Sequence, residues 1–124
     1  MQTTITSPKS GENTWLWLFK IFTGPVIIVI LIIHFVVNHF IPQTGLLTYE
    51  DIVAYYRIPI VPIMEICLLA FVVSHSMVGL RSIILDLKPS RGFMRAVDWV
   101  FSLAGVAAVA YGIWLILVIV AKGR

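Results

Sequence analysis

The sequence is poor in charge and has a single cysteine. Asp, Glu, Lys and Arg make up 12% of its 124 residues, about half the share found in a soluble globular domain. So little charge and so much apolar sequence exclude a soluble enzyme domain and a disordered tail. Cys67 has no second cysteine to pair with, which excludes a disulfide-stapled secreted module. We expect Cys67 to be a small buried apolar side chain.

Most of the chain is made of apolar residues. Hydrophobic residues make up 60% of it, and its mean hydropathy is +0.99. A membrane-crossing helix needs about 20 apolar residues, so the chain has room for three or four crossings and for no separate soluble domain. The net charge of +3 lies at helix ends, so we expect membrane lipid and no nucleic acid as a partner.

The hydrophobic pattern predicts an all-α integral membrane protein with one membrane-anchor domain over residues 1–124. An N-terminal cytoplasmic segment, residues 1–20, precedes three predicted transmembrane helices. These helices cover residues 21–41, 58–85 and 97–121. The first apolar stretch is too long for a signal peptide, so we expect it to be retained.

Two local patterns refine this picture. Thr48 and Asp51 have the spacing of a capping box, which predicts a short interfacial helix between the first two spans. The third span contains the small residues Gly105, Ala108 and Gly112, which permit close contact with another helix.

Lysine and arginine gather on one side of the predicted membrane. The first loop has none before Arg57, whereas basic residues flank the first span and the second loop, namely Lys9, Lys20, Arg81, Lys88, Arg91 and Arg95. By the positive-inside rule, the N-terminus lies inside and the C-terminus outside. Lys122 and Arg124 favour the opposite orientation more weakly.

His75 lies deep in the second predicted span. It is ten residues from the inner end at Leu85, about 15 Å, which is too far for its imidazole to reach water. An ionisable group at this depth is a functional candidate. Two interpretations stay open: a histidine that bonds a neighbouring helix, and an axial ligand of a haem iron.

His75 belongs to a stripe on one helical face. Gly79, Ser82 and Asp86 follow it within about 40° of the same line. Gly79 has no side chain, so it leaves room for a flat macrocycle or a close helix. The stripe ends in a carboxylate at the inner surface, which suits a path for electrons or protons to that surface.

Other ionisable residues lie in the predicted spans. We expect His34 nearer the outer side than His75, by about 5 Å for untilted helices. His34 could share one haem with His75, serve a second haem, or be a packing histidine. His39 is expected at the outer interface. Glu65 is expected to pair with a partner chain or to lie near the outer headgroups, and Arg81 to reach a lipid phosphate or a haem propionate.

The second span resembles the haem-ligand helix of the small membrane-anchor subunits of succinate dehydrogenase, or complex II. The resemblance rests on the block from Ser74 to Asp86, in which His75 is followed four residues later by Gly79, then by Leu-Arg, and by an Asp at the helix end. Two weaker stretches agree. Leu47-Thr48-Tyr49-Glu50 resembles the D-type anchor of the enterobacterial enzyme, and the first span resembles the actinobacterial and Thermus-type anchors in Trp17, Phe19, Thr23-Gly24 and His34.

By this resemblance, His75 corresponds to the axial ligand of haem b, and the opposite ligand would come from the sister membrane anchor, which is of the C type. Asp86 corresponds to the acidic residue at the quinone site, with Ser82 beside it on the same stripe. His34 corresponds to a ligand of a second haem in two-haem anchors, and Arg81 is a candidate partner of a haem propionate. The implied cofactors are one or two haems b and a quinone, either ubiquinone or menaquinone.

The chain departs from the family pattern at two positions. Leu87 stands where many relatives have a tyrosine that hydrogen-bonds the quinone, so we expect that donor from another protein of the complex. Ile21 stands where the first-span arginine is found, and Lys20, one position earlier, points about 100° away from it.

The resemblance implies a haem b-binding membrane-anchor subunit of a succinate:quinone oxidoreductase in the prokaryotic cytoplasmic membrane. It would form half of a helical bundle completed by the sister anchor, and it would dock the flavoprotein and iron–sulfur subunits on the inner face. The sequence carries no flavin or cluster motif, so the chain alone is not expected to oxidise succinate. The alternatives are a fumarate reductase anchor, another b-type cytochrome, and a haem-free transport or structural subunit.

Overall fold

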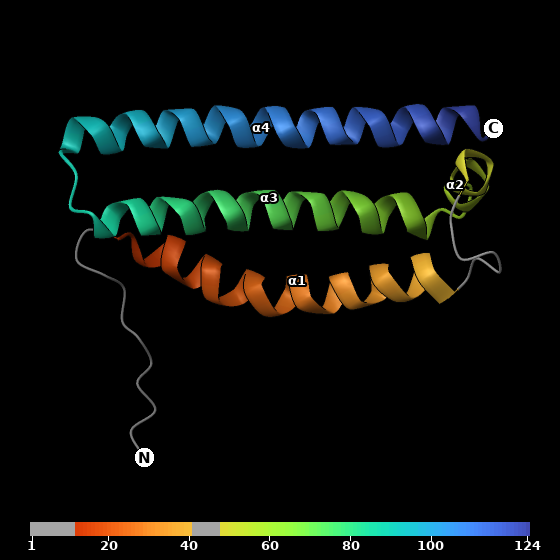
Figure 1. The fold of residues 1–124 in the computed structure, drawn as a ribbon, viewed down its shortest axis with the longest axis horizontal. Coiled ribbons are helices and arrows are strands. Elements are labelled where there is room, and N and C mark those ends of the chain that lie inside the picture. The colour runs from red at the N-terminus through yellow and green to blue at the C-terminus, as the bar shows by residue number, and fades with distance from the viewer. Residues whose placement is uncertain (1–11, 41–47) are drawn as a thin grey trace, which may run out of the picture.

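The computed structural model describes residues 12–40 and 48–124, and these form four helices and no strand. Three are long, namely α1 (Thr14–Phe40), α3 (Ile60–Asp86) and α4 (Arg91–Lys122). A short helix, α2 (Tyr49–Tyr55), lies between α1 and α3 in the sequence (Figure 1). Each long helix is long and apolar enough to cross a membrane. The predicted all-α architecture with three candidate spans is confirmed.

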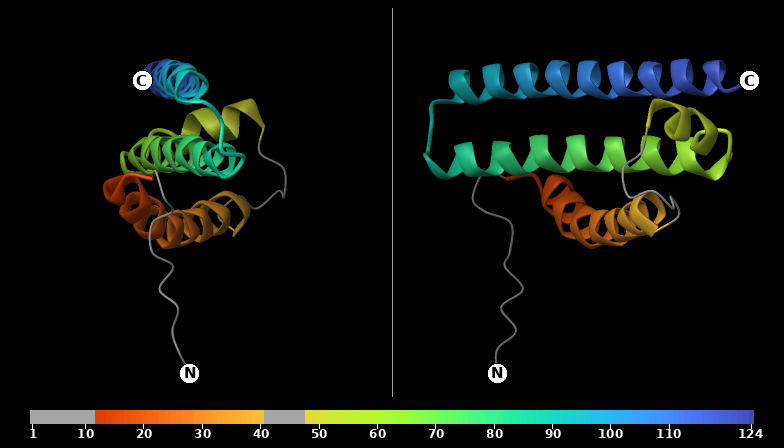
Figure 2. Two further views of the ribbon diagram at one scale, coloured as in Figure 1. Left: turned by 90° about the vertical axis from the view of Figure 1, so that its left-hand side faces the viewer. Right: turned by 45° about the vertical axis from the view of Figure 1, so that its right-hand side comes forward.

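The three long helices form one antiparallel layer, in which α3 packs against α1 on one side and α4 on the other (Figures 1 and 2). The layer has two open faces, so few apolar side chains of the described ranges are buried, namely Val61, Met94, Val97 and Ile116. The expectation that Cys67 is buried is wrong, because α3 is covered on two sides only and Cys67 is exposed.

The two ends of the layer differ. α1 begins, α3 ends and α4 begins at one end, which we call the Asp86 end (Figure 1). The other end, which carries α2 and the C-terminus, is called the α2 end.

Two of the long helices extend beyond the predicted membrane spans. α1 begins at Thr14, before the span predicted from 21, and the Asn13 side chain accepts a backbone N–H of its first turn at 2.9 Å. α4 begins at Arg91, before the span predicted from 97, and the Ser90 hydroxyl accepts a backbone N–H at 3.2 Å. The predicted end of the first span at 41 lies outside the described residues.

The short helix predicted between the first two spans is present as α2. Thr48 and Asp51 form the expected capping box, in which each side chain accepts the backbone N–H of the other at 3.3 and 2.9 Å. The bond from the Thr48 backbone, followed by the bond from its hydroxyl, holds the pKa of Asp51 below its ordinary value. α2 packs against the end of α4, where Gly123 is buried and an added Cβ would lie 3.1 Å from the Val53 carbonyl oxygen.

Two of the three small residues of the third span contact α3. A Cβ added at Gly105 would lie 3.5 Å from Met77 Cγ, and one added at Gly112 would overlap the side chain of Leu69. Ala108 is exposed. Glycine therefore lets α3 and α4 approach closely, as expected for membrane helices.

Candidate functional site

His75 is held against α1 by Thr23, with Thr23 Oγ1 2.7 Å from His75 Nδ1. The same hydroxyl donates to the Phe19 carbonyl oxygen at 2.7 Å. Because a hydroxyl has one proton to donate, Thr23 accepts the proton on Nδ1. Thr23 is fully buried. A neutral imidazole that donates from Nδ1 carries its lone pair on Nε2.

The surroundings of His75 fit an axial haem ligand. Among the residues that the structure describes, none hydrogen-bonds Nε2. Gly24 lies beside the ring, and a Cβ added there would be 3.7 Å from His75 Cε1. One turn along α3, a Cβ added at Gly79 would meet no atom within 4 Å. An oriented Nδ1–H, a lone pair on Nε2 and open space one turn away are what such a ligand requires.

The stripe beyond His75 leads to a charged cluster at the Asp86 end. The buried Ser82 hydroxyl accepts from Lys20 Nζ at 2.8 Å and donates to Glu12 Oε1 at 3.2 Å. Lys20 and Glu12 also form an ion pair, in which the Glu12 side chain is 2% exposed. Asp86 follows Ser82 by one turn and ends α3. Both His75 and Ser82 contact α1, so this face of α3 is the one that packs on the first span.

Two parts of this cluster differ from the expectations from sequence. Ile21 is exposed, whereas Lys20 lies one turn before the buried Thr23, on the face of α1 that packs on α3, and its Nζ reaches Ser82. Glu12 is a site residue that the sequence alone does not indicate. It lies in the polar segment before the first span, and only the packing of α1 on α3 brings it to Ser82.

A second polar pair joins α1 and α3 nearer the α2 end. His34 Nδ1 lies 2.8 Å from Glu65 Oε1, and the two side chains are 33% and 13% exposed. The Asn38 amide donates to the His34 carbonyl oxygen at 2.8 Å and lies 3.2 Å from His34 Nδ1. Glu65 thus has a partner within its own chain, which neither expectation named. His39 is exposed at the end of α1 and stacks on Phe35.

The two histidines lie at separate positions along the layer. His75 of α3 lies beside Thr23 of α1, and Glu65 of α3 lies beside His34 of α1. The ten residues from Glu65 to His75 correspond to about 15 Å. The expected offset of about 5 Å is wrong because it set Ile21 opposite Leu85. Lys20 and Thr23, on either side of Ile21, instead lie beside Ser82 and His75, which precede Leu85 and are nearer the α2 end. The two histidines are therefore held at separate positions along the contact between α1 and α3.

The sequence as a whole matches one family of membrane proteins, described as succinate dehydrogenase/fumarate reductase transmembrane subunit, over residues 2–121. The chain belongs to this family. It is 31% identical over 110 residues to the succinate dehydrogenase hydrophobic membrane anchor subunit of Archaeoglobus fulgidus, a match that covers 89% of this chain and 93% of that protein. It is also 31% identical over 78 residues to succinate dehydrogenase 2 membrane subunit SdhC of Mycobacterium tuberculosis, covering 63% and 57% of the two chains. No solved structure matches the chain.

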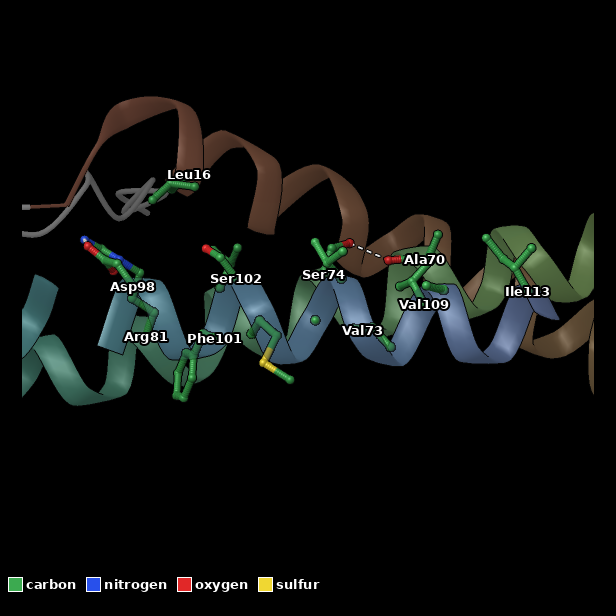
Figure 3. A pocket seen from close by; sticks show the side chains of 15 residues that line it. Leu16, Ala70, Val73, Ser74, Arg81, Asp98, Phe101, Ser102, Val109 and Ile113 are labelled. Carbon is green, nitrogen blue, oxygen red and sulfur yellow. Dashed lines mark hydrogen bonds and ion pairs between the residues drawn. The ribbon is translucent and has the colours of Figure 1, made fainter. Parts of the chain in front are cut away.

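In this membrane-anchor subunit, Arg81 lies on the side of α3 that faces α4. Its Nε donates to Asp98 Oδ1 at 2.5 Å and its Nη2 to Asp98 Oδ2 at 3.3 Å. The pair closes one end of a groove of about 840 Å³ between α3 and α4, whose other polar side chains are Ser74 and Ser102 (Figure 3). His75 does not line this groove. A lipid phosphate or a haem propionate would have to compete with Asp98 for Arg81.

The negative charge of Glu65 affects the ionisation of Tyr55 and Tyr56, at the end of α2. Burial, followed by Glu65 and Tyr55, raises the pKa of Tyr56 to about 12. Burial, followed by Glu65, also raises the pKa of Tyr55, whose buried hydroxyl has no hydrogen-bond partner among the described residues. Both phenols are therefore neutral at physiological pH, and the α2 end of the membrane anchor lies close to the Glu65 carboxylate.

Proposed function

We propose that this membrane anchor binds haem b through Nε2 of His75. The observation that carries the proposal is the pair of hydrogen bonds in which His75 Nδ1 donates to Thr23 and Thr23 donates to the Phe19 carbonyl oxygen, because this pair fixes the orientation of the ring. Metal-ligating histidines usually donate their other N–H to a fixed acceptor in this way. The chemistry that a haem b supplies when bound is one-electron transfer.

The opposite axial ligand would come from a sister membrane anchor. His34 is about 15 Å from His75 along the layer, and His39 lies at the far end of α1. Neither can complete the site at His75. The layer has two open faces against which further helices can pack, which suits a chain that forms half of a helical bundle.

His34 would hold a second haem nearer the α2 end. Its Nδ1 is engaged by Glu65, and no residue in the described ranges hydrogen-bonds its Nε2. The separation of His34 from His75 supports one haem at each histidine, with a ligand from the sister anchor at each.

The quinone site would lie at the Asp86 end. Ser82 is held there by Lys20 and Glu12, and Asp86 is one turn further along the same stripe. These side chains offer a hydroxyl, an ammonium group and carboxylates to the carbonyl oxygens of a quinone and the hydroxyls of a quinol. Because Leu87 cannot donate a hydrogen bond, a further donor would come from another protein of the complex. The occupant is ubiquinone or menaquinone.

The Asp86 end would face the cytoplasm of a prokaryotic cell and dock the iron–sulfur and flavoprotein subunits. Basic residues gather at this end, namely Lys20, Arg81, Lys88, Arg91 and Arg95, as the positive-inside rule requires of a cytoplasmic side. Electrons from succinate would arrive through the iron–sulfur subunit. In a fumarate reductase they would leave by the same route.

The dithionite-reduced optical spectrum of the purified native complex tests this proposal. The wild type is expected to show the bands of haem b, and His75→Ala is expected to lose part of them. His39→Ala is a matched control, because His39 is exposed and, among the described residues, its hydrogen bond and ring stacking are with Phe35 of its own helix. A wild type without haem bands, as a haem-free membrane subunit would give, contradicts the proposal. So does an unchanged spectrum for His75→Ala.

A further inference from the structure

Glu65 is a carboxylate within α3, a helix apolar enough to span a membrane, where a charged side chain is unfavourable. It is five residues beyond the start of α3, its side chain is only 13% exposed, and its Oε1 meets His34 Nδ1 at 2.8 Å. Ionisable groups at such positions are costly in a membrane and are functional by default. Among the described residues, His34 alone has a hydrogen bond with Glu65, so a hydrogen-bonding role of Glu65 is exerted on His34.

The contacts around His34 assign the roles of donor and acceptor. The Asn38 amide donates one N–H to the His34 carbonyl oxygen at 2.8 Å, and its nitrogen lies 3.2 Å from His34 Nδ1. An ionised carboxylate can only accept a hydrogen bond, so in the shorter contact, at 2.8 Å, Nδ1 donates to Glu65. A neutral ring that donates from Nδ1 carries its lone pair on Nε2, the nitrogen without a partner among the described residues.

We propose that Glu65 is a positioning residue that orients His34 and makes its Nε2 the ligating nitrogen. This inference rests on the proposed role of His34 as a second haem ligand. A carboxylate that accepts from a ligating histidine fixes the ring orientation and raises the basicity of the ligand.

The two histidines differ in the group that accepts their Nδ1–H. His75 donates to a neutral hydroxyl, Thr23, whereas His34 donates to a carboxylate. The more basic ligand stabilises the ferric state more strongly, and hydrogen bonding to the axial ligand is one of the protein's means of setting the potential. Glu65 therefore gives the His34 site the lower midpoint potential, compared with the same site lacking the carboxylate.

Two substitutions at Glu65 test the inference in the intact complex. Glu65→Gln keeps an oxygen that accepts from Nδ1 but removes the charge, so both haems should remain and the midpoint potential of one should rise. Glu65→Leu removes the acceptor, so the affinity for that haem should fall by about 10–100-fold. Glu50→Gln is the matched control, because Glu50 is an exposed carboxylate on α2. Haem content, redox titration at one fixed pH and low-temperature electron paramagnetic resonance provide the readouts.

His34→Ala, measured alongside, separates the possible failures. If it removes one haem and both Glu65 variants keep the wild-type haem content, potentials and resonance signals, the inference about Glu65 is overturned while the second haem stands. If His34→Ala leaves the haem content unchanged, the second haem and the inference about Glu65 fail together. Should Glu65→Leu not assemble, Glu65→Gln still decides, since an unmoved potential overturns the inference.

Discussion

Replacing Thr23 by valine should loosen haem binding at His75 without changing the shape of the helix contact. Thr23 is fully buried and its hydroxyl holds His75 Nδ1 at 2.7 Å. Valine has the same branched shape but no acceptor, so the Nδ1–H would be left without a partner. Stranding a buried donor costs about 1–3 kcal/mol. Loss of a partner that supports a metal ligand weakens affinity by about 10–100-fold, and the two magnitudes agree.

The rate of haem loss measures this effect. The purified complex is mixed with an excess of a haem-free acceptor protein, and the transfer is followed optically. Thr23→Val should lose the haem at His75 about 10–100-fold faster than the wild type. Thr23→Ser retains the hydroxyl and should behave nearly as the wild type does. If Thr23→Val releases haem at the wild-type rate with an unchanged midpoint potential, the reasoning about Thr23 is refuted.

Three further predictions concern packing and ionisation. Gly112→Val should overlap Leu69 and cost about 1–3 kcal/mol of stability, seen as a lower unfolding temperature that Leu69→Ala partly restores. The pKa of Asp51 lies below its ordinary 3.8, so its capping bond stabilises the folded state above pH 3.8. This stabilisation is lost as the pH falls through the lower pKa of the folded state. Calorimetry should show the difference between wild type and Asp51→Asn disappearing in acid. The pKa of Tyr56 is raised from 10.0 to about 12, so stability should fall as the pH rises between these values, and Tyr56→Phe should lack this loss.

Hydropathy and helical periodicity are enough to predict the three spans, because a membrane helix is recognisable by its apolar length. The starts of α1 and α4 are not predicted by hydropathy because Asn13 and Ser90 set them by hydrogen bonds, and an apolar window does not register such caps. The exposure of Cys67 escapes prediction for a different reason. Burial depends on how the helices are arranged, and a flat layer covers α3 on two sides only.

The stripe from His75 to Asp86 follows from the 3.6-residue period alone, but its partners on α1 do not. They depend on the register between two antiparallel helices, and that register follows from packing. The pairing of Arg81 with Asp98 could have been predicted, because the two lie at nearly equal distances from the turn that joins α3 and α4. Because α1 and α3 are antiparallel, the contact of Thr23 with His75 also places His34 beside Glu65.

The haem content of the native complex tests the central claim most directly. Haem b per copy of this chain should be two in the wild type, one in His34→Ala, one in His75→Ala and none in the double variant. The haem that remains should differ between the two single variants in midpoint potential, because the histidines lie at different positions and donate to different acceptors. If either single variant removes all the haem, or if both leave the wild-type amount, the account of two separate histidine sites is contradicted.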